Sequence, residues 1–405
     1  MKQLPSDFIA LLSQQIGEDE MRQFLLAMDE PCPVSIRWNG TADMTDKSPI
    51  VPWCPRGQYL AERPSFTMDP LLHAGAYYVQ EASSMFIWHL CQWLKDQGEW
   101  SGAVRALDLC AAPGGKSTLL ISALPEGSAL LANEIMPKRA QILRENISKW
   151  MRQSDKDVIV TNNSPADISR LGRDVFDFIL CDVPCSGEGM FRKDDEAIED
   201  WSLANVKMCQ NRQREIVSAI WPTLREGGFM IYSTCTYNRL EDEDNVRWIA
   251  DELGAEIISV PVPDAWNITP SPFYHFYPHR VKGEGFFCAL LRKGVKCDGF
   301  DSDRQSRNKA DKATLSQILS GNKKGKTPQL KVLPLEDKCE PPFIEVDSHD
   351  ALSYLHGEAL VLPPDTPRGL VTITYQGHPL GQAKNIGSRA NNLYPKEWRI
   401  RKQVN

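Results

Sequence analysis

Two cysteine-containing segments carry the side chains best suited to covalent chemistry. Asp182 and Cys185 follow Phe178–Cys181, a short apolar run typical of a buried strand. A second apolar run, Phe229–Tyr232, leads into a segment that contains Cys235. A thiolate is a strong nucleophile, and a carboxylate can hold or move a proton, so the two segments together could support nucleophilic catalysis. The alternative is structural, since cysteine is among the most buried residue types and often only packs.

A third segment has the composition of a cofactor-binding loop, with small residues between a strand at 106–110 and a helix starting at 117. It is not a P-loop, because Cys110 stands where that motif needs glycine, and Gly-x-Gly-x-x-Gly is absent. Glu134 ends the next strand, where a carboxylate could accept both hydroxyls of a ribose. Rossmann-like methyltransferases hold S-adenosylmethionine with such a loop and acid, and a degenerate nucleotide-binding loop is the alternative.

Methylation of a pyrimidine at C5 would use all of these groups. That carbon is a poor nucleophile until a thiolate adds to C6 of the ring. An acid such as Asp182 could hydrogen-bond or protonate N3 of a cytosine and stabilise the electron density pushed into the ring. After methyl transfer the C5 proton must leave and the thiol must be expelled, and a second cysteine could assist this step.

Alternating strands and helices must position these groups. Strands are expected at 106–110, 129–133, 158–161, 177–181 and 229–232, with a late strand at 286–291. A long helix is expected over 203–224 and to end at the glycines 227 and 228. This order predicts an α/β fold with a parallel sheet covered on both faces. The strands bearing Cys185 and Cys235 should be neighbours, so both thiols should reach one pocket.

Four regions are expected along the chain. Residues 1–100 form an N-terminal α+β extension, with a helix from 7 to 30 divided at Gly17, a strand at 34–39 and a proline-spotted loop region up to Pro70. Residues 101–293 form the Rossmann-like methyltransferase domain. Residues 294–334 form a basic linker, and residues 335–405 form a small β-rich unit with a hairpin turn at Gln376-Gly377.

Charge is distributed unevenly, although the net charge is −7. Residues 292–331 hold eleven Lys/Arg against four Asp/Glu, and residues 366–405 hold seven against one. The end of the chain, 394–402, interleaves aromatic and basic residues, which suits stacking on bases and pairing with phosphates. The asymmetry favours a polyanion docking on one side, and the alternative is a solvated linker with a basic tail.

Several classes are disfavoured by composition. No stretch approaches the ~18 apolar residues of a membrane span, and the start lacks the layout of a signal peptide. The eleven cysteines include no Cys-x-x-Cys pair, which argues against a disulfide framework and against structural zinc. We therefore expect a cytoplasmic protein without a metal or a membrane contact, and a monomer.

These motifs together resemble those of the Nop/Sun-type RNA cytosine-5 methyltransferases. The matching pieces are the segment Cys110–Lys116, Glu134, the segment Asp182–Gly187 and Ser233–Thr236. The longer form Pro184–Lys193 resembles the bacterial branch that methylates 16S ribosomal RNA, the methyltransferase F type. The C-terminal unit is similar, more loosely, to the PUA-like RNA-binding domain of that branch.

The resemblance implies specific roles. Cys235 is the nucleophile, Cys185 aids product release and Asp182 orients the base. The partner is RNA, either ribosomal RNA or the small ribosomal subunit. The cofactor is S-adenosyl-L-methionine, and the implied binding residues, Asp182 included, are Cys110, Ala111, Ala112, Pro113, Gly114, Gly115, Lys116 and Glu134.

One departure concerns the adenine contact. Many members of the family have an acid after the third strand, where this chain has Asn162-Asn163-Ser164. Asn163 could bond the adenine amino group through its carbonyl oxygen, and we include it among the cofactor-binding candidates. The nearest acid, Asp167, is expected to be an ordinary turn residue.

Three other functions stay open. The same chemistry could act on transfer RNA. An amino-methyltransferase would place Asn/Asp-Pro-Pro-aromatic where this chain has Asp182-Val183-Pro184-Cys185. A non-catalytic RNA-binding assembly factor could keep the fold without turnover, although Cys235 and Asp182 are both present.

Overall fold

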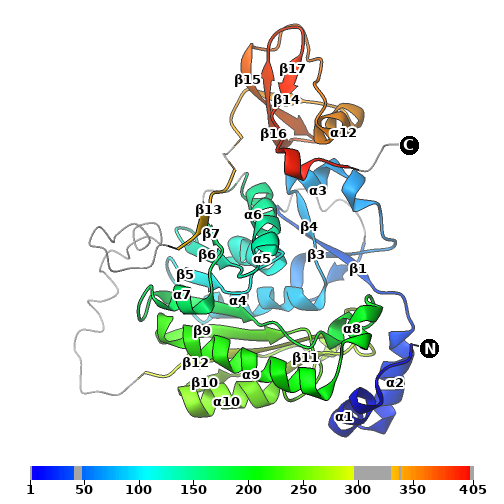
Figure 1. Ribbon diagram of the computed structural model, residues 1–405, viewed down its shortest axis with the longest axis vertical. Helices are drawn as coiled ribbons and strands as arrows, with labels where there is room; N and C mark the ends of the chain where they lie inside the picture. The colour runs from blue at the N-terminus through cyan, green and yellow to red at the C-terminus, as the bar shows by residue number, and fades with distance from the viewer. Residues whose placement is uncertain are drawn as a thin grey trace.

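The computed structural model describes residues 2–40, 48–152, 154, 156–295, 330–336 and 339–401 (Figure 1). The helices are α1 (Ser6–Ile16), α2 (Glu18–Met28), α3 (Pro70–Ala74), α4 (Ile87–Asp96), α5 (Gly115–Ala123), α6 (Pro137–Met151), α7 (Pro165–Ser169), α8 (Asp195–Glu199), α9 (Leu203–Ile220), α10 (Glu243–Leu253) and α12 (Ser348–His356). In these ranges no helix has the length and apolarity that crossing a bilayer requires.

The strands form three sheets. The strands of the first are β1 (Val34–Trp38), β2 (Ile50–Val51), β3 (Cys54–Leu60) and β4 (Tyr77–Val79). Those of the second are β5 (Arg105–Asp108), β6 (Ala129–Asn133), β7 (Asp157–Thr161), β8 (Phe176–Asp182), β9 (Leu224–Thr234), β10 (Ala255–Ile258), β11 (Tyr274–Phe276), β12 (Phe286–Lys293) and β13 (Val332–Leu333). Those of the third are β14 (Phe343–Glu345), β15 (Gly369–Tyr375), β16 (His378–Asn385) and β17 (Ala390–Asn392).

The N-terminal region pairs two helices with an antiparallel sheet of order β2-β3-β1-β4. Gly17, at φ +86°, separates α1 from α2 as predicted. The stretch up to Pro70 was expected to be loop, and this was wrong, because it contains β2 and β3. Pro55 and Gly57 interrupt the alternation of apolar and polar residues by which β3 could be found in the sequence. Gly57 is used for close packing, since a Cβ there would lie 2.6 Å from the sulfur of Met85.

The central sheet has the order β10-β12-β9-β8-β5-β6-β7-β13. Its five middle strands, from β9 to β7, are parallel, whereas β12, β10 and β13 run antiparallel to their neighbours. The chain builds outward from β5 through β6 and β7 on one side and through β8 and β9 on the other. The direction in which successive strands are added therefore reverses between β5 and β8. In open α/β sheets, ligands bind beyond the carboxyl ends of the strands at such a point.

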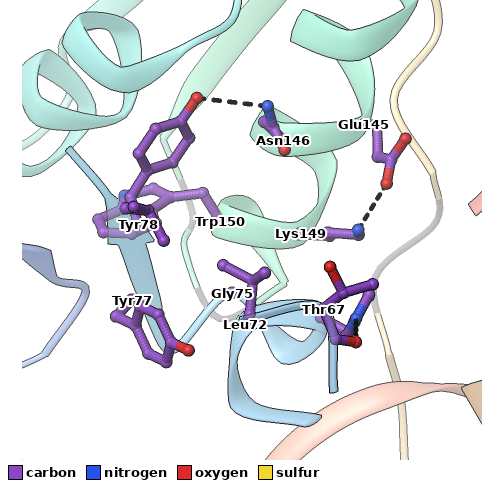
Figure 2. A pocket seen from close by; sticks show the side chains of 11 residues that line it. Thr67, Leu72, Gly75, Tyr77, Tyr78, Glu145, Asn146, Lys149 and Trp150 are labelled. Carbon is purple, nitrogen blue, oxygen red and sulfur yellow. Dashed lines mark hydrogen bonds and ion pairs between the residues drawn. The ribbon is translucent and has the colours of Figure 1, made fainter. Parts of the chain in front are cut away.

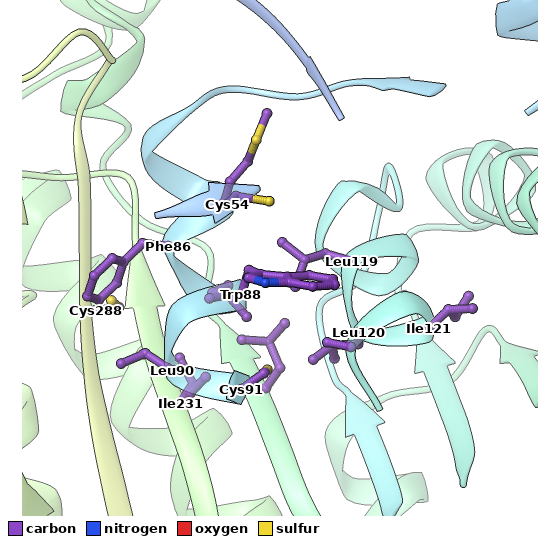
Figure 3. Packing of buried hydrophobic residues seen from close by; sticks show 14 of the residues in the cluster. Cys54, Phe86, Trp88, Leu90, Cys91, Leu119, Leu120, Ile121, Ile231 and Cys288 are labelled. Atoms are coloured by element: carbon purple, nitrogen blue, oxygen red, sulfur yellow. The ribbon is translucent and has the colours of Figure 1, made fainter. Parts of the chain in front are cut away.

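Helices cover both faces of this sheet. On one face, apolar side chains of α4 and α5 pack against Ile231 and Cys288 of β9 and β12 (Figure 3). On the other face, residues of α7, α9 and α10 pack against the same strands. Each large apolar side chain buried in this way stabilises the fold by roughly 1.5–3 kcal/mol.

The end of α9 differs from the prediction. The helix stops at Ile220, before a 3₁₀ turn that contains Pro222, and not at the glycines 227 and 228. Gly228 lies inside β9. A Cβ at Gly228 would stand 2.9 Å from the carbonyl oxygen of Asp177, so the glycine allows β9 to approach β8 closely.

The C-terminal region has a sheet of order β14-β15-β16-β17 and the helix α12. The predicted hairpin turn at Gln376-Gly377 is confirmed, with φ +48° and +76°. Tyr394 and Trp398, expected to stack on bases, are only 2% and 5% exposed. That expectation was wrong, because both rings belong to the apolar cluster between α12 and the sheet.

The expected linker is partly structured. Val332 and Leu333 form β13, which pairs with β7 at the edge of the central sheet. Residues 296–329 lie outside the described ranges. The C-terminal region also contacts the core directly, because Arg152, which follows α6, donates a hydrogen bond to the carbonyl oxygen of Pro379 at 2.9 Å.

Candidate active site

Cys185 and Cys235 meet at the carboxyl ends of β8 and β9. Their Sγ atoms lie 3.0 Å apart, which confirms that both thiols face one site. The backbone N–H of Cys235 also points to the sulfur of Cys185, at 3.4 Å. The hydrogen bond with Cys235 and then burial raise the pKa of Cys185 well above its ordinary value. Cys185 therefore keeps its proton and can donate it to the neighbouring sulfur.

The strand register explains this meeting. β8 and β9 are parallel neighbours in which Asp182 pairs with Ser233, so both strands end at the same level. The backbone N–H of Val183 continues the ladder to the carbonyl oxygen of Ser233 at 3.0 Å. The two cysteines follow within three residues of these partners and are directed to the same edge.

The carboxylate of Asp182 is held through both oxygens. Ser233 Oγ donates to Oδ1 at 2.7 Å, and the ammonium of Lys116 lies 2.9 Å from Oδ2. Burial opposes the charge on Lys116, but the attraction of Asp182 outweighs it, and the pKa of Lys116 is raised. Cys235 adds to this effect, so the ammonium stands near the sulfur of Cys235 as well as the carboxylate of Asp182.

Buried acids that the sequence analysis did not select support the Cys235 segment. Glu188 accepts the backbone N–H groups of Tyr237 at 2.7 Å and Asn238 at 3.0 Å. Burial raises the pKa of Glu188 to about 7. The backbone just after the cysteine is thus fixed by a side chain from the Cys185 segment.

Glu241 and Asp242 have a similar role. They precede α10, which begins at Glu243, and both side chains are buried. Asp242 accepts the hydroxyls of Thr234 and Thr236, on either side of Cys235. The sequence could have indicated that Asp242 holds the Cys235 segment only through the two threonine hydroxyls. Whether these hydroxyls are buried depends on tertiary packing, which the sequence does not show.

A pair of glycines brings the two sides of the site together. The N–H of Gly189 donates to the carbonyl oxygen of Cys235 at 2.8 Å. A Cβ at Gly189 would lie 2.6 Å from the carbonyl oxygen of Gly285 and 2.9 Å from that of Cys235. No side chain fits between these backbones, so the sequence needs glycine at this position.

The loop of small residues follows β5, on the other side of the switch point. Gly114, at φ +115°, turns the chain into α5, and Gly115 packs against the ring of Tyr78. Arg139 donates to the carbonyl oxygen of Ala112 at 2.7 Å, and Asn146 donates to that of Pro113 at 2.8 Å. The loop from Cys110 to Lys116 is therefore fixed by α6 and lies beside Asp182.

The surroundings of this loop fit S-adenosylmethionine. Glu134 ends β6 with its carboxylate 3% exposed, and its Oε1 accepts the N–H of Met136 at 2.8 Å. Asp108 is buried at the end of β5, where Ser117 donates to Oδ2, and Oδ1 has no partner among the described residues. Two carboxylates beside a glycine turn suit a ligand that carries positive charge and ribose hydroxyls.

Asn163 is placed differently from the expectation. Its Oδ1 accepts the N–H of Lys331 at 3.0 Å, and its Nδ2 lies 3.3 Å from the carbonyl oxygen of the same residue. The side chain therefore binds the segment that leads into β13 instead of projecting freely toward a ligand. Asp167 forms a capping box with Ser164 at the start of α7, in keeping with its expected local role.

Three family models match the sequence in succession. Residues 4–82 match the N-terminal domain of 16S rRNA methyltransferase RsmF, residues 94–292 match 16S rRNA methyltransferase RsmB/F, and residues 341–400 match the methyltransferase RsmF PUA domain. The chain belongs to the RsmB/F family. The predicted Rossmann-like methyltransferase core with an N-terminal extension and a PUA-like domain is thereby confirmed.

Individual relatives agree with this family. Ribosomal RNA small subunit methyltransferase F of Enterobacter sp. (strain 638) is 29% identical over 466 aligned residues, covering 97% of this chain and 95% of the relative. The protein of the same name from Aliivibrio salmonicida is 32% identical over 311 residues, covering 72% of this chain and 64% of the relative. A solved methyltransferase homolog protein from Pyrococcus horikoshii is 25% identical with a TM-score of 0.58, covering 70% and 93% of the two chains. Like its family, this RsmB/F member uses S-adenosylmethionine as methyl donor.

Proposed function

We propose that this RsmB/F protein methylates C5 of a cytosine in 16S ribosomal RNA through a covalent bond between Cys235 and C6 of the base. The observation that supports this proposal most is the 3.0 Å approach of two thiols beside a fixed carboxylate. An enzyme that methylates an exocyclic amine or a hydroxyl has no use for two sulfur atoms. The names of the relatives support ribosomal RNA as the substrate.

In this proposal the two cysteines have different roles, with Cys235 as the nucleophile. The raised pKa of Cys185, which keeps its thiol protonated, supports this division. The sulfur of Cys235 adds to C6, and the ring electrons move toward C5 and N3. Asp182, fixed by Ser233 and Lys116, is placed to orient the base through its polar edge.

The residues also account for release of the product. S-adenosylmethionine supplies an electrophilic methyl group, which C5 takes up. The methyl donor departs as S-adenosylhomocysteine, and a solvent water takes the proton from C5. The electron pair of that C–H bond re-forms the ring double bond as the bond between C6 and the sulfur of Cys235 breaks, which returns Cys235 as a thiolate. The 3.0 Å contact of Cys185 with that sulfur supports a role for Cys185 in this elimination.

An assay with labelled methyl donor tests the proposal. Purified protein is incubated with S-adenosylmethionine that carries a labelled methyl group and with 16S ribosomal RNA, and the RNA is digested to nucleosides. Label in 5-methylcytidine is the expected result. A parallel reaction contains transfer RNA in place of ribosomal RNA. Label on an adenosine amine, or label in transfer RNA but not in 16S ribosomal RNA, would contradict the proposal.

A further inference from the structure

A second cavity lies away from the cysteines, between α3, β4 and α6 (Figure 2). Its volume of about 310 Å³ is at the lower end of the ~300–1,000 Å³ usual for small-ligand sites. That space suits one flat ring system with its sugar. The lining residues are Thr67, Leu72, His73, Gly75, Tyr77, Tyr78, Val79, Glu145, Asn146, Lys149 and Trp150.

Aromatic side chains form one side of this cavity. Figure 2 shows Tyr77, Tyr78 and Trp150 gathered there, with Lys149 and Glu145 opposite them. The positions of these rings are fixed, because the hydroxyl of Tyr77 donates to Asp69 at 2.6 Å and Trp150 is buried. Rigid ring faces beside a cavity of this size favour a planar ligand that can stack.

Two buried nitrogen atoms of the lining residues lack a partner in the described protein. His73 Nε2 lies 2.9 Å from the carbonyl oxygen of Thr67, and because a carbonyl only accepts, Nε2 holds the hydrogen. His73 Nδ1 is therefore an unused acceptor. Burial lowers the pKa of His73 to about 4, so the ring is neutral. The indole N–H of Trp150 is an unused donor.

The charges of the lining argue against a phosphate. Lys149 is paired with Glu145 at 2.6 Å, and burial lowers the pKa of the lysine. Since His73 is neutral, the described lining offers no uncompensated positive charge. Aromatic faces with one acceptor and one donor match the edge of a nucleobase better than a phosphate group.

The cavity lies between the cofactor loop and the C-terminal region. The ring of Tyr78 that lines it also packs against Gly115 of the cofactor loop. On the other side, the ammonium of Lys149 lies 5.5 Å from the centre of the Trp398 ring. An RNA strand that reaches from the PUA domain to Cys235 would therefore pass close to this cavity.

We propose that this cavity takes up an unpaired base of the RNA substrate, a neighbour of the target cytosine, and thereby selects the sequence or the loop that is methylated. This inference depends on the proposed function for the identity of the substrate as RNA. The base would stack on the ring of Tyr78, the more exposed of the two tyrosines, and present its polar edge to His73 and Trp150. The cavity would then contribute to RNA affinity without contacting the methyl donor.

Filling the cavity tests this role. Leu72→Trp places an indole in the space, while Leu71→Trp, its half-buried neighbour outside the lining, is the matched control. We expect Leu72→Trp to raise KM for RNA roughly 5- to 150-fold, the range for loss of one stacked base. kcat at saturating RNA and the dissociation constant for S-adenosylmethionine should be unchanged. Leu71→Trp should behave like the wild type.

Photocrosslinking provides a second test that does not depend on the folding of a variant. Wild-type protein is irradiated with 16S ribosomal RNA containing 4-thiouridine, and crosslinked peptides are identified by mass spectrometry. Crosslinks in 67–79 or 145–150 are expected. If the wild type methylates cytosine but shows no such crosslinks, and Leu72→Trp keeps its KM, the cavity is not a base site. Crosslinks without methylated cytosine would uphold the cavity and overturn the proposed reaction.

Discussion

At the scale of single residues, the two cysteines have different surroundings. Cys185 is half-buried, and its hydrogen bond with the sulfur of Cys235, followed by burial, raises its pKa. Cys235 is held by its backbone, through Gly189 and the residues that follow it, and its sulfur is near the ammonium of Lys116. The two sulfur atoms therefore differ in their partners, although they are in contact.

Substitution of each cysteine should give a different result. Cys235→Ala should abolish methylation, by roughly 10⁴-fold or more, because the nucleophile is lost. Cys185→Ala should also stop turnover, but with a covalent protein–RNA adduct that accumulates, because elimination fails. Denaturing gels with labelled RNA detect the adduct. Cys91→Ala, buried on α4 with Lys95 as its nearby charged group, is the control and should remain active. Normal methylation by Cys235→Ala would contradict the assignment.

The raised pKa of Glu188 predicts that the stability of the protein depends on pH. Burial and then the nearby Glu241 raise its pKa from an ordinary 4.5 to about 7 in the folded protein. Between these values the folded state holds one more proton than the unfolded state, so the free energy of unfolding falls as pH rises. The protonated carboxyl of Glu188 stabilises the folded state fully below pH ~4.5. This contribution to the free energy of unfolding, roughly 3 kcal/mol at most, is lost as pH rises past ~7.

Urea unfolding at several pH values measures this effect. Glu188→Gln cannot ionise and should show a smaller fall in unfolding free energy between pH ~4.5 and ~7 than the wild type. The fall should not vanish, because burial also raises the pKa of Asp108 to about 7. An unchanged slope in Glu188→Gln would show that the carboxyl of Glu188 does not titrate in this range.

At the scale of elements, the site depends on how closely its segments approach one another. The 3₁₀ turn Glu188–Met190 lies against Gly285, just before β12, and against the Cys235 segment. This contact fixes the distance between the two cysteine loops. A methyl group added at Gly189 would have to displace the backbone of Gly285 or of Cys235. Overpacking against a backbone costs more than overpacking against a flexible side chain.

Gly189→Ala should therefore damage catalysis more than folding. We expect a loss of stability of about 1–3 kcal/mol and a fall of at least tenfold in kcat, with S-adenosylmethionine affinity unchanged. Gly102→Ala is the control, because Gly102 is exposed and a Cβ there meets nothing within 4 Å. Thermal unfolding, kinetics and cofactor titration separate these effects. A fully active Gly189→Ala would show that the loops tolerate displacement.

The sequence predicts some of these elements better than others. Central strands such as β8 are continuous apolar runs, so their position and the cysteine pair could be predicted. β3 was missed because its proline and glycine look like loop residues, and β13 was missed because two apolar residues are too few to signal a strand. Glu241 and Asp242 are buried, which an acidic run beside a helix start does not reveal in the sequence.

At the scale of the whole molecule, positive charge gathers on the hairpin of β16 and β17, although the net charge is −7. Lys384 pairs with Asn391 across the hairpin, and Arg389 donates to the side chain of Asn391 at 3.1 Å, so both cations share one face. Both are exposed, and the guanidinium of the exposed Arg368 lies against the turn at Gly387. With Tyr394 and Trp398 buried, this face can contact RNA through charge but not through those rings.

The double variant Lys384→Gln, Arg389→Gln tests that contact, because it removes two charges from an exposed surface without altering the core. RNA affinity should fall, and the slope of log affinity against log salt should decrease by about 0.7 for each lost phosphate contact to a single strand. Lys207→Gln, an exposed cation on α9, is the control and should leave the slope unchanged. Binding is measured by filter retention over a salt series. Parallel salt curves for all three proteins would show that RNA reaches Cys235 without this face.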